Sequence, residues 1–112
     1  MNISIITFTE NGTKLAEKIR QAFVGTKTEE AKNLGLSLSD WTRQQFAEKN
    51  AIVVIGACGI AVRMIAPFVS DKLSDSPVVV ADEAGTFVIP LLSGHMGGAN
   101  ELAEQIAGQI GG

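Results

Sequence analysis

The sequence predicts an α/β fold, a three-layer α/β/α sandwich whose mostly parallel sheet has about five strands, with one antiparallel hairpin and a flavodoxin-like arrangement. Two observations predict it. Short runs of β-branched and other apolar residues alternate along the chain with longer segments whose apolar residues recur at helical spacing. In addition, residues 51–55 and 78–81 are apolar without interruption, which is typical of strands buried on both faces of a sheet.

The first half of the chain predicts one clear strand and two helices. Residues 3–8 are rich in isoleucine and form the first strand. A helix with one apolar face follows, and either Asn11 or Thr13 is its expected cap. Residues 25–38 carry a weaker signal, which is compatible with a short edge strand. Ser39 is the expected cap of the second helix.

The second half opens with the buried strand at residues 51–55. Residues 56–59 then turn the chain into a helix whose apolar residues lie on one face. Pro67 ends or kinks this helix, because proline lacks the backbone N–H that the next turn needs.

The remaining elements are two strands and a helix. Residues 78–81 form the second buried strand, and residues 82–85 form a turn that suggests an antiparallel hairpin. Residues 86–91 follow as a strand in which Pro90 favours a sheet edge. Apolar residues at helical spacing over residues 99–107 predict the last helix.

Length and composition limit the classes of protein. The 112 residues suit a single domain spanning residues 1–112, with 46% hydrophobic and 19% charged residues, as in globular proteins. The net charge of −3 argues against a nucleic-acid partner. One cysteine excludes an internal disulfide and suits a reducing compartment. The longest apolar run, residues 51–62, is shorter than the roughly 18–20 residues that span a bilayer. We therefore expect a cytoplasmic protein with no membrane partner.

Three segments of the second half are candidates for chemistry, because ligands of open α/β sheets bind beyond the carboxyl ends of the strands. The first comprises residues 56–63. Free N–H groups at a helix start near Gly59 could hold an anion, and Arg63 could bind a carboxylate. The same glycines are equally explained by close packing of strand and helix, and Arg63 by a surface position.

The second candidate is the pair Asp82 and Glu83. Adjacent carboxylates at a strand end can act as acid and base when their environments separate their pKa values. More often such a pair belongs to a solvated turn, in which Gly85 would adopt positive φ.

The third candidate is residues 93–100, which contain the only histidine, His95. His95 is expected in a glycine loop at a helix N-terminus, where the helix dipole lowers the pKa of a histidine and favours the neutral base. A surface or capping position explains the residue equally well. Cys58 is expected to be a small buried apolar residue, and one histidine with one cysteine does not make a usual metal cluster. These residues predict a small-molecule site without specifying a reaction.

The same segments also carry a family resemblance. The most specific run is Leu91-Leu92-Ser93-Gly94-His95-Met96-Gly97-Gly98-Ala99-Asn100. With the rest of residues 51–107, it resembles the amino-terminal domain of the cobalamin biosynthesis protein CbiG. The resemblance implies cobalt-precorrin-5A hydrolase, which opens the ring-A δ-lactone of a cobalt-bound tetrapyrrole and releases acetaldehyde, giving cobalt-precorrin-5B in the anaerobic route to vitamin B12. The substrate carries the cobalt, so no separate cofactor is expected.

Proteins of that family are about three times as long, and their middle and carboxyl-terminal domains are the implied partners of this domain. A homodimer is left open. Under this resemblance, our hypothesis is that His95, oriented by Glu83 or Asp82, activates water against the lactone carbonyl. Backbone N–H groups of Gly97 and Gly98 would stabilise the oxyanion. The candidate ligands for the acetate and propionate groups of the substrate are Gly59, Arg63, Lys72, Ser93, Gly94, Gly97, Gly98 and Asn100.

Three other functions remain open from the sequence. The domain could bind the corrinoid or assist assembly without catalysis, the chemistry being done by other domains. It could bind a nucleotide or flavin by fold analogy, although no phosphate-loop signature is present. It could also be an interaction domain whose glycines serve only packing.

Overall fold

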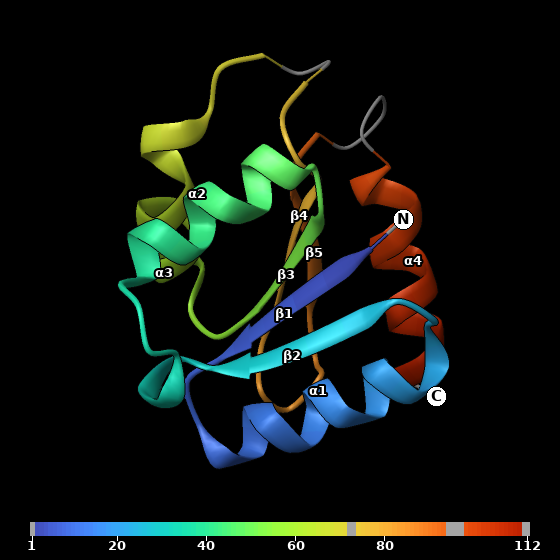
Figure 1. The fold of residues 1–112 in the computed structure, drawn as a ribbon. Helices are drawn as coiled ribbons and strands as arrows, with labels where there is room; N and C mark the ends of the chain where they lie inside the picture. Colours follow the sequence, from blue (N-terminus) through green and yellow to red (C-terminus); the bar gives the residue numbers. More distant parts are fainter. Residues whose placement is uncertain (1, 72–73, 94–97, 111–112) are drawn as a thin grey trace.

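A computed structural model describes residues 2–71, 74–93 and 98–110 and shows strands and helices in alternation (Figure 1). The strands are β1 (Ile3–Thr7), β2 (Thr26–Glu30), β3 (Ala51–Ile55), β4 (Val78–Ala81) and β5 (Val88–Leu92). The helices are α1 (Glu10–Ala22), α2 (Leu38–Glu48), α3 (Cys58–Ile65) and α4 (Ala99–Ile110), with short 3-10 turns η1 (Ala31–Asn33) and η2 (Ala66–Phe68). Among these described helices, none is long and apolar enough to cross a bilayer.

The five strands form one sheet in the order β2-β1-β3-β4-β5. Strands β1 to β4 are parallel to their neighbours, and β5 is antiparallel to β4. This confirms the predicted mostly parallel sheet with one antiparallel hairpin. The strand order is the flavodoxin-like one, with the last strand reversed.

Helices cover both faces of the sheet (Figure 1). On one face, α1 and α4 pack on alternate residues of the strands, such as Ile5 and Val53. On the other face, α2 and α3 pack on the strand residues whose side chains point the opposite way, such as Ile6 and Val54. Residues of β1, β3 and β4 are buried throughout, because each of these strands has helices above and below it.

Helix α1 begins earlier than the sequence predicts. Its cap is Thr9, whose side-chain oxygen accepts a hydrogen bond from the N–H of Gly12 at 3.0 Å. The predicted caps, Asn11 and Thr13, therefore lie inside the helix, and that prediction is wrong. A cap must have extended backbone as well as an oxygen, and Thr9 has it directly after the strand.

The cap of helix α2 likewise lies two residues before the predicted one. Ser37, with extended backbone, accepts the N–H of Asp40 at 3.0 Å, and Ser39 is already helical. Before this helix, the weak segment does contain the edge strand β2. Its side chains alternate between half-buried and exposed positions, as expected for a strand at the border of a sheet.

The hairpin strand β5 forms the other border of the sheet, and Pro90 lies within it as predicted. The strand begins at Val88 rather than at residue 86, because the turn is longer: the N–H of Asp82 donates to the carbonyl of Phe87. Phe87 and Ile89 stay exposed at this border. Helix α3 ends at Ile65, and Pro67 lies in the 3-10 turn that follows, which confirms that prediction.

The direction of the strands defines two ends of the sheet. At the carboxyl end lie the last residues of β1 to β4. Because β5 is antiparallel, Leu92 pairs with Val78, and β5 finishes at the opposite, amino end. Helix α4 then returns toward the carboxyl end, where Ile110 lies close to Gly85.

Candidate functional site

The structure divides the predicted site residues between the two ends of the sheet. Gly59 follows β3, and Asp82 and Glu83 follow β4, so these three lie at the carboxyl end. Ser93, Gly98 and Asn100 lie at the amino end, because β5 runs in the reverse direction. The expectation that all three candidate segments follow the carboxyl ends of strands is therefore wrong for residues 93 and 98–100. His95, Lys72, Gly94 and Gly97 lie outside the described residues.

At the carboxyl end, the two glycines of the first candidate segment differ. A Cβ added at Gly56 would lie 3.2 Å from the ring of Phe8, so this glycine leaves room for the phenyl ring of the residue that follows β1. A Cβ added at Gly59 would meet nothing within 4 Å. Close packing thus explains Gly56 and does not explain Gly59.

Cys58 is exposed, which corrects the expectation that it is buried. It is the first residue of α3, and Gly59 and Ile60 beside it are exposed too. The buried residues of α3 begin only at Ala61. The side chain of Cys58 therefore packs against no core.

Arg63 is exposed in the last turn of α3. It borders a groove of about 240 Å³ between the start of α2 and α3. The other lining residues are mostly apolar: Leu38, Ser39, Ile60, Met64 and Pro67. This groove lies on the α2–α3 face of the sheet, away from Asp82 and from Ser93.

Asp82 stabilises the hairpin turn. Its Oδ1 accepts the N–H of Phe87 at 2.7 Å, and its carbonyl accepts the N–H of Gly85 at 3.0 Å. The bond from Phe87 is the main cause that holds the pKa of Asp82 below its ordinary value. Gly85 has φ of +73°, the conformation expected of it. An aspartate that stays ionised in this way is suited to a structural turn rather than to donating a proton.

Glu83 is exposed and faces a different element. Its carboxylate accepts a hydrogen bond from the Thr9 hydroxyl, at the start of α1. It also borders a hollow of about 360 Å³ that is lined by Lys14 and Lys18 of α1. The adjacent carboxylates of Asp82 and Glu83 therefore contact separate partners.

At the amino end, Ser93 connects three segments. Its hydroxyl donates to the carbonyl of Asp75 at 3.1 Å, and its carbonyl accepts the N–H of Ala99 at 3.1 Å. Its backbone is left-handed, with φ of +57°, which is uncommon for a residue other than glycine. Gly98, with φ of +90°, leads directly into α4.

Sequence reasoning missed Asp75, a buried carboxylate in the loop before β4. Its oxygens accept the N–H and hydroxyl of Ser70 at 3.0 to 3.2 Å and the N–H of Asp71 at 3.2 Å. The surrounding sequence, serines and aspartates before a proline, is typical of any polar loop. Only its burial distinguishes Asp75.

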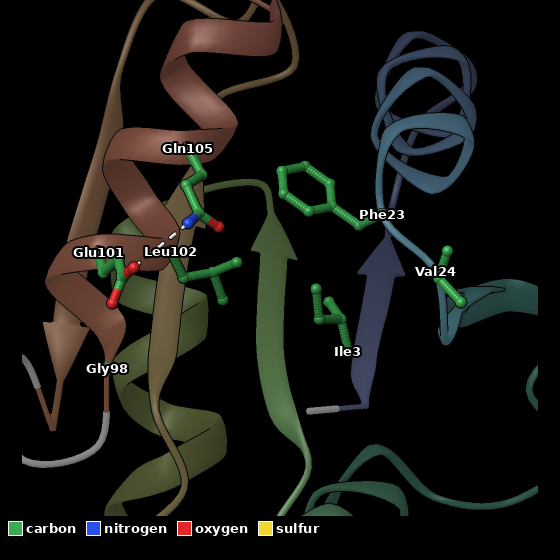
Figure 2. A pocket seen from close by; sticks show the side chains of 7 residues that line it. All are labelled: Ile3, Phe23, Val24, Gly98, Glu101, Leu102 and Gln105. Carbon is green, nitrogen blue, oxygen red and sulfur yellow. Dashed lines mark hydrogen bonds between the residues drawn. The ribbon is translucent and has the colours of Figure 1, made fainter.

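A pocket of about 280 Å³ lies at the amino end beside the start of α4 (Figure 2). Side chains of Ile3, Phe23 and Leu102 converge on it from β1, the end of α1 and α4. At its rim, the amide of Gln105 donates to the Glu101 carboxylate at 3.4 Å. Gly98 and Val24 complete the lining. The sequence did not predict this pocket, because its walls come from segments far apart in the chain.

Comparison with known proteins identifies the family. Residues 40–112 match the family described as cobalamin synthesis G N-terminal. The chain belongs to this family. The match includes both ends of the sheet and the whole of the segment from Ser93 to Asn100, and the predicted family resemblance is thereby confirmed.

Cobalt-precorrin-5A hydrolases are among the relatives of this cobalamin synthesis G domain. The protein of that name from Salmonella typhimurium is 41% identical over 98% of this chain and 33% of its own length. The one from Priestia megaterium is 46% identical over 58% of this chain and 17% of its length. A probable cobalt-precorrin-5A hydrolase from Methanocaldococcus jannaschii is 29% identical over all of this chain and 33% of its length.

A solved structure shares the fold. It is a putative cobalamin biosynthesis protein G homolog from Sulfolobus solfataricus, which superposes with a TM-score of 0.75 over 98% of this chain and 34% of that one, at 24% identity. The chain thus spans about a third of the Salmonella and Methanocaldococcus relatives and of this structure.

Proposed function

We propose that this chain is the domain of a cobalt-precorrin-5A hydrolase that receives ring A of the substrate and hydrolyses its δ-lactone. The observation that carries the proposal is the 41% identity to the Salmonella typhimurium hydrolase over nearly the whole chain. We infer the site at the amino end of the sheet, where the residues flanking His95 lie.

The pocket beside α4 supports this location. Its volume of about 280 Å³ is at or below the lower limit of about 300 Å³ for pockets that enclose a drug-sized ligand, and a tetrapyrrole is larger still. It would therefore hold one edge of the macrocycle and not the ring system. The apolar side chains of Phe23 and Leu102 suit the hydrocarbon part of the substrate, and Gln105 offers an amide to a polar group.

The chemistry requires a base twice. Water adds to the lactone carbonyl while a base takes its proton, and the acyl–oxygen bond breaks to leave a carboxylate and a free hydroxyl. Removal of the hydroxyl proton then cleaves the bond to the ring. The C20 carbon leaves with its methyl group as acetaldehyde, and the electron pair stays on the macrocycle. We assign the base in both steps to His95, with the N–H groups of Gly97 and Gly98 stabilising the oxyanion.

Asp82 and Glu83 have no catalytic part in this proposal. Asp82 and Glu83 contact Phe87 and Thr9 and lie at the other end of the sheet from Ser93, so they are not assigned the orientation of His95. Asn100 lies at the amino end. Asn100 and Lys72 remain proposed ligands of the substrate carboxylates. Gly59 and Arg63 lie on α3, across the sheet from the pocket, and remain predictions for a separate contact.

The test is release of acetaldehyde from cobalt-precorrin-5A under anaerobic conditions. Three proteins are compared: the 112-residue chain, the Salmonella typhimurium hydrolase, and a chimera in which this chain replaces the matching third of that hydrolase. We expect the chimera to release acetaldehyde. If the chain alone also does so, the whole site lies in this domain. If only the chimera does so, the domain supplies part of the site, and the His95 variant described next decides whether that part is catalytic or only binds the substrate. A folded chimera that releases none, beside an active Salmonella enzyme, overturns the proposal.

The role of His95 is tested in the same chimera. His95→Ala should lower kcat by roughly 10²- to 10⁴-fold, the usual contribution of a general base. The matched control is Glu83→Gln, which removes a carboxylate at the other end of the sheet and should leave kcat unchanged. Activity near that of the unsubstituted chimera in His95→Ala rules out the assigned role.

A further inference from the structure

Two described residues other than glycine have positive φ, Lys49 and Ser93. Lys49 ends α2, where left-handed backbone is common because it closes the last turn of a helix. Ser93 instead directly follows the strand β5 and closes no helix. A left-handed serine there is held against its own preference, so the surrounding contacts must impose it.

Those contacts are specific. The Ser93 hydroxyl donates to the carbonyl of Asp75, and the Ser93 carbonyl accepts the N–H of Ala99, the first residue of α4. Asp75 cannot shift easily, because its buried carboxylate accepts four hydrogen bonds from Ser70 and Asp71. The end of β5 and the start of α4 are thereby joined to the loop before β4. We call this set of bonds the Ser93 junction.

We propose that Ser93 is a positioning residue of the hydrolase: the Ser93 junction fixes the end of β5 and the start of α4, the two described elements that flank the proposed base His95 in the sequence. This inference rests on the proposed function. It also revises the predicted role of Ser93 as a substrate ligand, since its hydroxyl is already directed at the Asp75 carbonyl. A misplacement of about 1 Å in a catalytic group can cost roughly 10²-fold in rate, so such a junction is able to control turnover.

The kinetic test uses Ser93→Ala and Ser93→Gly in the chimera. Both remove the hydroxyl, but glycine adopts left-handed backbone without cost. We expect kcat to fall by roughly 10- to 100-fold in both variants with KM nearly unchanged. A rise in KM with kcat retained would instead make Ser93 a substrate ligand and overturn the proposal. Full activity of Ser93→Gly would overturn it as well, by showing that the hydroxyl is dispensable. Lys49→Gly, the matched control for positive φ, should leave kcat unchanged.

A second measurement separates the junction from the reaction. In the 112-residue chain, the Ala99 amide should exchange its hydrogen faster with Ser93→Ala than without it, whereas the Asn50 amide, bonded to Gln45, should not change. Unchanged exchange at Ala99 would show that the hydroxyl does not hold the junction. If the unsubstituted chimera releases no acetaldehyde, the proposed function fails and the catalytic role of Ser93 fails with it, whatever the exchange rates.

Discussion

At the turn between β4 and β5, one polar side chain stabilises the conformation of the loop. The Asp82 carboxylate accepts the N–H of Phe87 and lies half-buried, while the neighbouring Glu83 turns outward to Thr9. A charged acceptor strengthens such a bond, and the bond in turn favours the ionised form of Asp82. Its lowered pKa is therefore a sign of a turn-holding aspartate.

This predicts a pH dependence of stability. The pKa of Asp82 is below its ordinary value of 3.8 in the folded chain, so ionised Asp82 stabilises the fold above that value. The contribution is lost as the pH falls through the lowered pKa, because the protonated acid accepts the bond less well. Asp82→Asn should lower the free energy of unfolding at neutral pH by a small amount, and the difference should vanish in strong acid. Urea unfolding across this range measures it, and an equal difference at every pH would contradict the assignment.

At the scale of elements, helices α1 and α2 each begin after a residue that has both a side-chain hydroxyl oxygen and extended backbone. Thr9 and Ser37 both stand just after the chain leaves extended structure, and each accepts an N–H three residues on. Serine and threonine occur at several nearby positions, so residue type alone does not select the cap. The strands that precede the helices, and the loops that connect them, determine which one is used.

The two serines of α2 allow a matched comparison. Ser37→Ala should lower the free energy of unfolding by about 1 kcal/mol, since it leaves the N–H of Asp40 without its side-chain acceptor. Ser39→Ala should change it little or raise it by a few tenths of a kcal/mol, because position 39 is already helical and alanine is the better helix former. Chemical denaturation of the two variants checks this. The reverse ranking would place the cap at Ser39.

The whole molecule has two cores separated by one sheet. Ile5 packs with α1 and α4, and Ile6, the next residue, packs with α2 and α3. Both are fully buried. A sheet of this kind transmits no direct side-chain contact from one face to the other, so the two cores contribute to stability as separate clusters of contacts.

Separate cores predict additive effects. Ile5→Val and Ile6→Val should each lower the free energy of unfolding by about 0.5 to 1.5 kcal/mol. The double variant should show their sum within about 0.5 kcal/mol, as for sites that share no partners. Val24→Ala, at a residue that is 98% exposed, is the control and should change stability by less than about 0.5 kcal/mol. A clear departure from additivity in urea unfolding would mean that the faces are coupled.

Much of the fold was predictable because buried positions recur along the chain with the period of the strand or helix that contains them. The uninterrupted apolar runs at β3 and β4 and the helical spacing in α4 report which faces are covered, and both strands appear at the predicted residues. The position of Pro90 at a border strand followed from its missing N–H. The family resemblance was also readable, because it is carried by one continuous run from Leu91 to Asn100.

The location of the site could not be read in the same way. Periodicity says whether a residue faces a core, but it does not say which end of the sheet a loop occupies. The antiparallel pairing of Leu92 with Val78 decided that, and it separated Ser93 from Asp82. The bond from Ser93 to Asp75 and the pocket between Phe23 and Leu102 join segments far apart in sequence. The sequence alone determined the elements, the layers and the family; the tertiary structure decided which loops meet, because neighbours across a sheet are set by pairing and not by order along the chain.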